Sequence, residues 1–234
     1  MKKLLLMPIV SILFISCNMG LNGEGAATSK KEFPLTDYQS IEANCNCDIT
    51  LIPSNNPKVV VESHQNLIDN LEINVNGNNL KIKEKSKVDQ FDLYHVVVYS
   101  PASLNEIELN KQSRMKISGT LKADRFKIEA KDQSFLDQAY VDIQDFEIEL
   151  SDQAHLTITG TAINLDVDSS DQANGNFADL QTVDIKFKAE DNSNMSLYAM
   201  KNLSGEAQNN AQVSYKGDPN KNTTEKDRAF INKN

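Results

Sequence analysis

The sequence predicts an all-β fold: a parallel β-helix or related solenoid of about 20-residue repeats, preceded by a less regular β-rich part. The first observation behind this prediction is an acid–amide–small segment that recurs through the chain, with first residues 18 to 21 positions apart. The copies are Lys111-Gln112-Ser113, Asp132-Gln133-Ser134, Asp152-Gln153-Ala154, Asp171-Gln172-Ala173, Asp191-Asn192-Ser193 and Asn209-Asn210-Ala211. A fixed period of this length is typical of stacked copies of one supersecondary unit.

The second observation is an apolar alternation on both sides of each segment. Phe126, Ile128 and Ala130 precede one copy, and similar runs precede and follow the others. A period of two places such residues on one face of a strand. Gly119 and Gly160 mark a further bend, so one repeat contains a strand, a turn, a strand, a bend and a short third strand. A meander sandwich is the competing all-β architecture, but it has no need to repeat its turn chemistry.

The amino terminus predicts export. Residues 1–16, MKKLLLMPIVSILFIS, place two lysines before an apolar stretch, as in a secretory signal peptide. Cys17 follows Ser16 as at a bacterial lipoprotein cleavage site, although Phe14 stands where leucine is usual. We expect Cys17 to be acylated, with residues 17–32 as a flexible, lipid-anchored linker. A plain signal peptide that is cut elsewhere is the alternative.

Residues 33–101 are predicted to be β-rich but irregular. Asn76-Gly77 is a hairpin turn signal, and residues 64–70 suit one helical turn. The run from Ile41 to Cys45 resembles the strand before a repeat's turn, so the coil would begin there. The strand candidates are residues 49–52, 59–62, 71–75, 80–83 and 94–99.

Removing Cys17 leaves two cysteines, Cys45 and Cys47, in a chain expected to be exported and therefore able to oxidise its thiols. On a regular strand their side chains would lie about 6.6 Å apart along the strand, so a disulfide would need a tight turn. A turn disulfide and two packed thiols both fit. The spacing matches neither a redox motif nor a zinc site, which needs a second pair.

The recurring segment is most simply a corner. Asp and Asn tolerate the left-handed backbone region. The second residues would then stack as an amide ladder of Gln133, Gln153, Gln172, Asn192 and Asn210. The alternative is a calcium column of Asp132, Asp152, Asp171 and Asp191, with carboxylates about 4.8 Å apart on successive coils. No glycine-rich calcium loop accompanies these residues, which favours the corner, and no other cofactor is expected.

The chain is acidic, and its regular repeats are expected over about residues 104–216. The formal charge of −9 becomes −11 once Lys2 and Lys3 are removed, with 22 basic and 33 acidic residues left. Such a surface disfavours nucleic acid as a partner. Residues 217–234 are polar and are predicted to form a disordered tail.

Several segments together resemble a known family. They are Phe33-Pro34, Tyr38-Gln39-Ser40-Ile41-Glu42, Cys47-Asp48-Ile49-Thr50-Leu51, Val59-Val60-Val61-Glu62, Asn79-Leu80-Lys81-Ile82, Ser118-Gly119 and Thr159-Gly160. Over about residues 33–216 the pattern resembles the autotransporter adhesin head domain, or head GIN domain, of exported lipoproteins of Bacteroidetes-type bacteria. The resemblance implies a β-helical fold and an envelope location, and it transfers no functional residues. The Gly-Ile-Asn string is absent, and Ala162-Ile163-Asn164 is its nearest match.

The sequence offers no catalytic set. Its three arginines and its three histidines, His64, His95 and His155, are scattered, and it has no tryptophan. Five tyrosines are candidate ligand contacts: Tyr38, Tyr94, Tyr99, Tyr140 and Tyr198. We expect a non-catalytic lipoprotein, anchored to the bacterial outer membrane at its surface or periplasmic face, with an adhesin-like binding or structural role toward an extracellular protein or glycan. A polysaccharide-binding or polysaccharide-processing β-helix protein is the alternative.

Overall fold

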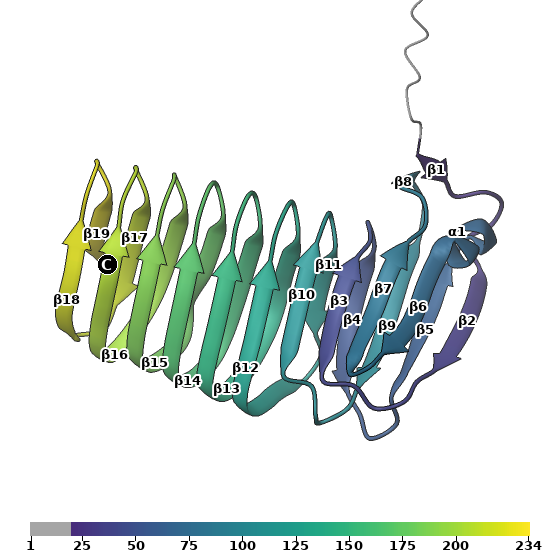
Figure 1. The fold of residues 1–234 in the computed structure, drawn as a ribbon, viewed down its shortest axis with the longest axis horizontal. Helices are drawn as coiled ribbons and strands as arrows, with labels where there is room; N and C mark the ends of the chain where they lie inside the picture. Colours follow the sequence, from purple (N-terminus) through teal and green to yellow (C-terminus); the bar gives the residue numbers. More distant parts are fainter. Residues whose placement is uncertain (1–19) are drawn as a thin grey trace, which may run out of the picture.

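Stacked parallel strands dominate the computed structural model, which describes residues 20–234 (Figure 1). The predicted signal peptide and Cys17 lie outside the described residues. A 17-stranded sheet winds through the molecule, while β1 (Leu21–Asn22) pairs separately with β8 (Val88–Gln90). The predicted all-β, solenoidal class is confirmed.

The coils of the solenoid pair in register. β3 (Ser40–Asn44) and β4 (Asp48–Pro53) pair in parallel with the first strands of the regular repeats, so the coil begins near Ile41 as predicted. Farther along, Phe126 pairs with Phe146, which pairs with Leu165. The repeat strands are β10 (Glu106–Asn110), β11 (Arg114–Ile117), β12 (Thr120–Ala130), β13 (Phe135–Leu150), β14 (His155–Ser169), β15 (Asn174–Ala189), β16 (Asn194–Ala207), β17 (Gln212–Lys216), β18 (Asn220–Glu225) and β19 (Phe230–Lys233).

Each regular coil contains a strand before the turn, a strand after it and, beyond a bend, the predicted short third strand, such as residues 120–123 beside 140–143. We call the stacked segments before the turns the pre-turn sheet; it includes residues 106–110, 125–130, 145–150, 164–169, 184–189, 202–207 and 220–225. The stacked segments after the turns form the post-turn sheet: residues 114–117, 135–137, 155–157, 174–176, 194–197, 212–215 and 230–233. A register shift between Thr157 and Thr159 marks the bend that joins the two sheets.

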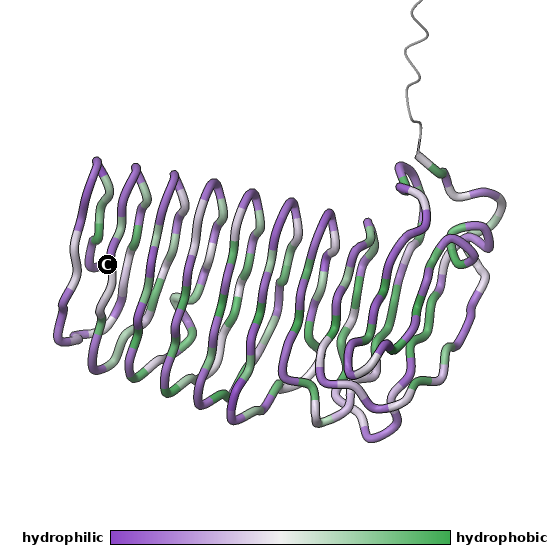
Figure 2. Tube along the Cα trace, in the orientation of Figure 1, coloured by the Kyte–Doolittle hydropathy of each residue, from purple (hydrophilic) through white to green (hydrophobic). Residues whose placement is uncertain are grey.

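The core runs along the solenoid axis. Phe126, Phe146 and Phe187 are each 2% exposed, as the alternation predicts, and the first two rings meet edge to face with centroids 6.5 Å apart. Figure 2 shows hydrophobic and hydrophilic positions alternating along the strands. Burying a large apolar side chain contributes about 1.5–3 kcal/mol, so the repeated inward positions are the main source of stability.

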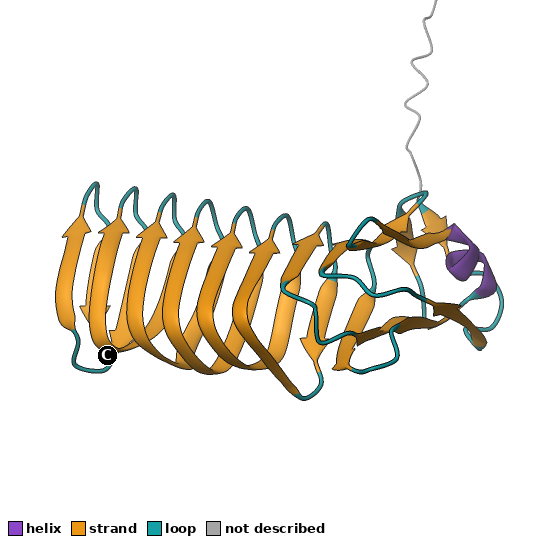
Figure 3. Cartoon of the chain, turned by 60° about the horizontal axis from the view of Figure 1, so that its bottom comes forward, coloured by secondary structure: helices purple, strands orange, loops and turns teal. Residues whose placement is uncertain are grey.

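Shorter, mixed strands close the amino-terminal end (Figure 3). β5 (Lys58–Ser63) runs antiparallel to β9 (Tyr94–Ser100), and β6 (Leu71–Asn76) forms the predicted hairpin with β7 (Asn79–Glu84). All five strand candidates and the short helix, α1 (Gln65–Asn70), are confirmed. In the described part of the chain, no helix is both long and apolar enough to cross a membrane.

The predicted linker is wrong for residues 20–32. β2 (Ser29–Pro34) pairs antiparallel with β5, and the Nδ2 of Asn66 donates to the carbonyl of Asn22 at 2.7 Å. His64 is 2% exposed, and its Nδ1 lies 3.1 Å from the carbonyl of Gly25. This segment is held by backbone pairing and polar contacts, which need no apolar alternation in its sequence.

The predicted disordered tail is also wrong. Residues 220–225 and 230–233 form one more coil, joined by a turn in which Asp227 and Arg228 have positive φ. The composition is polar because this coil has no further coil over it. Lys221, Thr223 and Glu225 pair with Leu203, Gly205 and Ala207, and so take positions that are inward-facing in the previous coil.

Candidate binding surfaces

The recurring segments form corners, as predicted. Their first residues have φ values between 53° and 59°, in the left-handed region, and the third residues are buried. Lys111 takes the same conformation as the acids, with φ 58°. The small third residue fits the narrow end of the coil. We call this row of corners the turn edge.

The amide ladder is only partly confirmed. Side-chain hydrogen bonds join Gln112 to Gln133 at 3.0 Å, Gln133 to Gln153 at 3.2 Å, and Asn192 to Asn210 at 3.3 Å. No such bond joins Gln172 to either neighbour. The backbone changes there: Gln172 N donates back to Asp152, whereas Asn192 N donates forward to Asn209. Asn192 also has positive φ, whereas Gln172 does not, so the backbone conformation of the amide residue differs between these two turns.

Three acids of the predicted column, Asp132, Asp152 and Asp171, line a shallow groove of about 540 Å³ along the turn edge. The carboxylates of the column accept turn hydrogen bonds: Asp132 from Lys111 N at 2.7 Å, Asp171 from Ser170 Oγ at 2.9 Å, and Asp191 from Asn209 Nδ2 at 2.9 Å. Among residues 20–234, no group of three His, Cys, Asp or Glu side chains is placed to hold a metal ion. Calcium binding by Asp132, Asp152, Asp171 and Asp191 stays a prediction.

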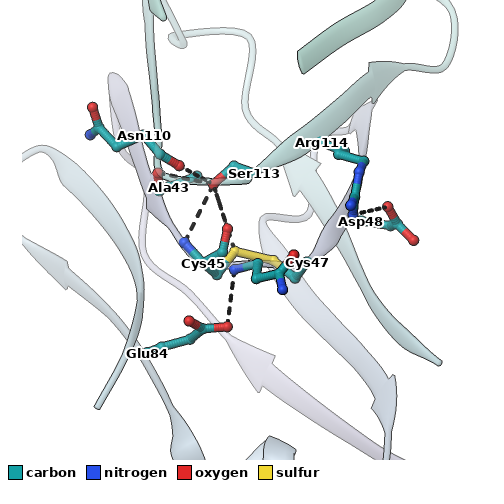
Figure 4. The surroundings of a disulfide bond; sticks show 9 residues. Ala43, Cys45, Cys47, Asp48, Glu84, Asn110, Ser113 and Arg114 are labelled. Atoms are coloured by element: carbon teal, nitrogen blue, oxygen red, sulfur yellow. Dashed lines mark hydrogen bonds and ion pairs between the residues drawn. A yellow bond between two sulfur atoms is a disulfide. The ribbon is translucent and has the colours of Figure 1, made fainter. Parts of the chain in front are cut away.

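The cysteine pair occupies a corner. Cys45 and Cys47 are joined by a disulfide, with Cα atoms 5.3 Å apart (Figure 4). The register between β3 and β10 places them beside Lys111 and Ser113, so the cross-linked turn takes the place of an acid–amide–small segment. The Ser113 hydroxyl accepts from Cys45 N at 3.3 Å and lies 2.8 Å from the carbonyl of Asn110.

A buried acid lies beneath this turn. Glu84 is 5% exposed, and its Oε1 accepts from Asn46 N at 3.0 Å. Burial raises the pKa of Glu84, an effect that the Asn46 N–H partly opposes. Burial, followed by the Glu84 charge, raises the pKa of the neighbouring Tyr94 hydroxyl. Both groups help to organise the first coil and do not open onto a described groove.

The outer face of the pre-turn sheet is strongly charged. Lys127 lies 3.3 Å from Glu147 and 2.7 Å from Glu149, and Lys186 lies 2.8 Å from Asp166. The carboxylates beside Lys127 raise its pKa. Exposed ion pairs of this kind each contribute about 0–1 kcal/mol to the stability of the fold. Their main effect is that this face of the solenoid is covered by charged groups.

The post-turn sheet has the opposite character. From the coil of His155 onward, its outward side chains form two columns in register, and none carries a formal charge with histidine neutral. We call this surface the uncharged face. Its first column is His155, Asn174, Asn194, Gln212 and Phe230, and its second is Thr157, Asn176, Ser196, Ser214 and Asn232.

The structure corrects several predicted contact residues. Tyr38 and Tyr94 are buried and cannot contact a ligand, whereas Tyr140 is 52% exposed on the bend. Among the histidines, His64 is buried and His95 bonds Thr50, while only His155 lies on the uncharged face. Sequence reasoning missed Phe135 and Phe230, which are exposed. Each follows the small residue of a turn, a position that is always outward, and this signal could have found them.

Comparison with known proteins agrees with the fold. A family model described as "Putative auto-transporter adhesin, head GIN domain" matches residues 37–219. No curated protein matches the chain significantly.

Three solved structures illustrate the likeness. A putative adhesin from Bacteroides fragilis NCTC 9343 has 18% identity and a TM-score of 0.75, over 88% of this chain and 96% of that one. A putative lipid binding protein and a putative adhesin, both from Parabacteroides distasonis ATCC 8503, have 19% and 20% identity. Each has a TM-score of 0.70 over 92% of this chain and 99% of its own. At these identities the likeness concerns the fold.

Proposed function

The chain belongs to the family described as "Putative auto-transporter adhesin, head GIN domain", and from this premise we propose that it is a non-catalytic cell-envelope lipoprotein with an adhesin-like binding role. The observation that carries the proposal is the ordered repetition of uncharged, mostly amide or hydroxyl side chains across successive coils of the uncharged face. Repeated shallow contacts suit the capture of an extended partner, because many weak contacts add to high avidity.

The described surfaces support binding better than catalysis. The acids of the turn edge accept hydrogen bonds from their own turn or from the neighbouring one, and the lysines of the pre-turn sheet lie in ion pairs. Arg114 and Arg125 are placed beside Asp48 and Asp145, and they belong to different sheets. Acid–base catalysis needs groups that are free to act on one reacting atom, whereas these acids and bases are engaged with one another or with the turns.

The proposed location in the cell envelope rests on the amino-terminal sequence. Acylation of Cys17 would tether the solenoid by its amino-terminal end and leave the uncharged face and the carboxyl-terminal coil accessible. The wild-type chain should partition into detergent with the membrane fraction, and Cys17→Ser should be released into the soluble fraction. Equal partitioning of both chains would contradict lipid anchoring.

Protease accessibility on intact cells tests surface display. Cleavage from outside, together with adhesion of beads that carry residues 20–234 to immobilised extracellular proteins or glycans, would support the proposal. Protection until the outer membrane is opened would exclude surface adhesion. A periplasmic structural role would then replace it.

A further inference from the structure

We propose that the uncharged face binds a neutral polysaccharide whose chain lies along the solenoid axis across the coils of β14, β15, β16 and β17. The inference rests on the proposed binding function and names the ligand class and the surface.

The first argument is the contrast in charge. Charged residues make up 24% of the chain, and they crowd the pre-turn sheet, yet the two columns from His155 to Asn232 contain none. In the preceding coils the same columns hold Arg114, Lys116 and Asp137. A polyanion would find no basic partner here and would be repelled by the net charge of −9. The surface therefore suits a ligand without charge.

The second argument is unused hydrogen-bonding capacity. Within residues 20–234, the side chains of Asn174, Asn194 and Gln212 make no hydrogen bond to another protein group, although Ser196 and Ser214 bond each other at 3.0 Å. An amide group both donates and accepts, as a sugar hydroxyl does. A row of amides can therefore satisfy successive hydroxyls in either orientation.

The third argument is spacing. Asn174 pairs in register with Asn194, which pairs with Gln212, so like groups repeat at the strand separation of about 4.8 Å. This repeat is similar to the rise per residue of an extended chain of hexose units. Consecutive sugars could thus meet equivalent side chains on consecutive coils.

Aromatic rings mark the two ends of the row. Phe135 is 37% exposed and lies against His155, with ring centroids 5.9 Å apart, and Phe230 is 56% exposed on the last coil. The C–H faces of sugar rings pack on such apolar surfaces. A protein partner would require more apolar area at the centre of the face, where only amides and hydroxyls lie.

The face also has a defined border. On the bend side, the uncharged face ends at the ion pair of Lys216 with Asp179, whose charged atoms are 3.1 Å apart. On the opposite side it ends at the turn edge. The strip between them is two residues wide on each strand, the width of one extended polymer chain. A lipid surface would require apolar side chains across this strip, and it has none between His155 and Gln212.

Affinity electrophoresis tests the proposal with residues 20–234, which contain the whole described sheet and core. Native gels are cast with glucomannan, mixed-linkage β-glucan or dextran as neutral probes, and with polygalacturonate as the anionic probe. We expect at least one neutral polymer to retard the protein, with little change on adding salt, because no ion pair is involved.

Amino-acid substitutions test whether the polysaccharide binds to the uncharged face. Asn174→Ala with Asn194→Ala should raise the apparent Kd about tenfold, since two net hydrogen bonds are lost. The matched control Asn222→Ala removes an exposed amide on the pre-turn sheet and should change nothing. Asn194→Arg, which inserts bulk and charge, should abolish retardation. Circular dichroism of each variant checks that it is folded.

Four results would overturn the inference. Retardation by polygalacturonate alone contradicts a neutral ligand, and equal retardation of all variants places binding elsewhere. A dimer in sedimentation equilibrium that Asn194→Arg dissociates would assign the face to a second copy of the chain. If the beads adhere while no neutral polymer binds or competes, only this inference fails. If the beads never adhere, the proposed function itself fails.

Discussion

Lys221 lies in the last coil at the position that Leu203 holds in the coil before it, because the two residues pair in register. Leu203 is fully buried, whereas Lys221 is exposed with its ammonium 5.7 Å from the Tyr215 ring centroid. Thr223 and Glu225 repeat the exchange at the next two inward positions. Inward-pointing charges on an edge strand are a known protection against edge-to-edge pairing. The last coil is thus a polar cap.

Replacing this cap by core residues should cause self-association. Lys221→Leu with Thr223→Val and Glu225→Ala would present an apolar end and an unpaired strand edge to a second molecule. Light scattering after size exclusion should show species larger than those of the wild type at equal concentration. Asn222→Leu with Thr224→Val, on the outward side of the same strand, is the control. An unchanged mass for the cap variant would show that the polar side chains do not block pairing.

The disulfide should stabilise the first coil modestly. Loop-closure entropy for so short a loop predicts a loss of about 1.5 kcal/mol in Cys45→Ala with Cys47→Ala. Because Asn209-Asn210-Ala211 is a native corner, Cys45→Asn with Cys47→Ala should recover part of that loss. Thermal unfolding of the two variants measures the difference, at about 2–4 °C per kcal/mol. Equal melting temperatures for the two variants would argue against equivalence of the cross-linked turn and the corners.

Two bend glycines should differ sharply in their tolerance of alanine. Both have positive φ, +104° at Gly119 and +118° at Gly160. A Cβ at Gly119 would have only Pro53 Cδ nearby, at 4.0 Å, so Gly119→Ala should cost only the backbone strain of about 1–2 kcal/mol. A Cβ at Gly160 would lie 2.0 Å from the carbonyl oxygen of Val141, so Gly160→Ala should cost over about 4 kcal/mol. Urea unfolding of both variants gives the comparison, and similar midpoints would contradict it.

The repeat itself made most of the fold predictable, since burial on one strand face forces period-two alternation. The last coil was not predicted because the polar composition of residues 217–234 was considered without the spacing of the turn segments. Asp227-Arg228-Ala229 follows Asn209 by 18 positions, the same step as the one before it. Residues 29–34 were missed for another reason: a strand held by backbone hydrogen bonds at an edge needs no alternation.

The uncharged face could not be found by scanning the sequence in order. Asn174, Asn194 and Gln212 follow one another at intervals of 20 and 18 residues, and their neighbours in the sequence are small, apolar or uncharged polar residues like those around many other positions. Only the register of the coils brings them into one column. The turn acids were easier to notice because each is followed by an amide residue and then by Ser or Ala, but the structure uses their oxygens mainly within the turn edge.

Glu84 should make stability depend on pH. Its folded-state pKa is raised above the ordinary value of 4.5, so the folded chain binds this proton more tightly than the unfolded chain does. The contribution of Glu84 to the unfolding free energy is therefore greatest below 4.5 and falls as pH rises through the folded-state pKa. Each unit of the shift corresponds to about 1.4 kcal/mol.

Glu84→Gln removes the charge and retains an oxygen that can accept from Asn46 N. Urea unfolding across this pH range should show a smaller decline for Glu84→Gln than for the wild type, while Glu225→Gln, an exposed acid on the last coil, should follow the wild type. Parallel curves for wild type and Glu84→Gln would mean that Glu84 ionises in the folded protein without cost.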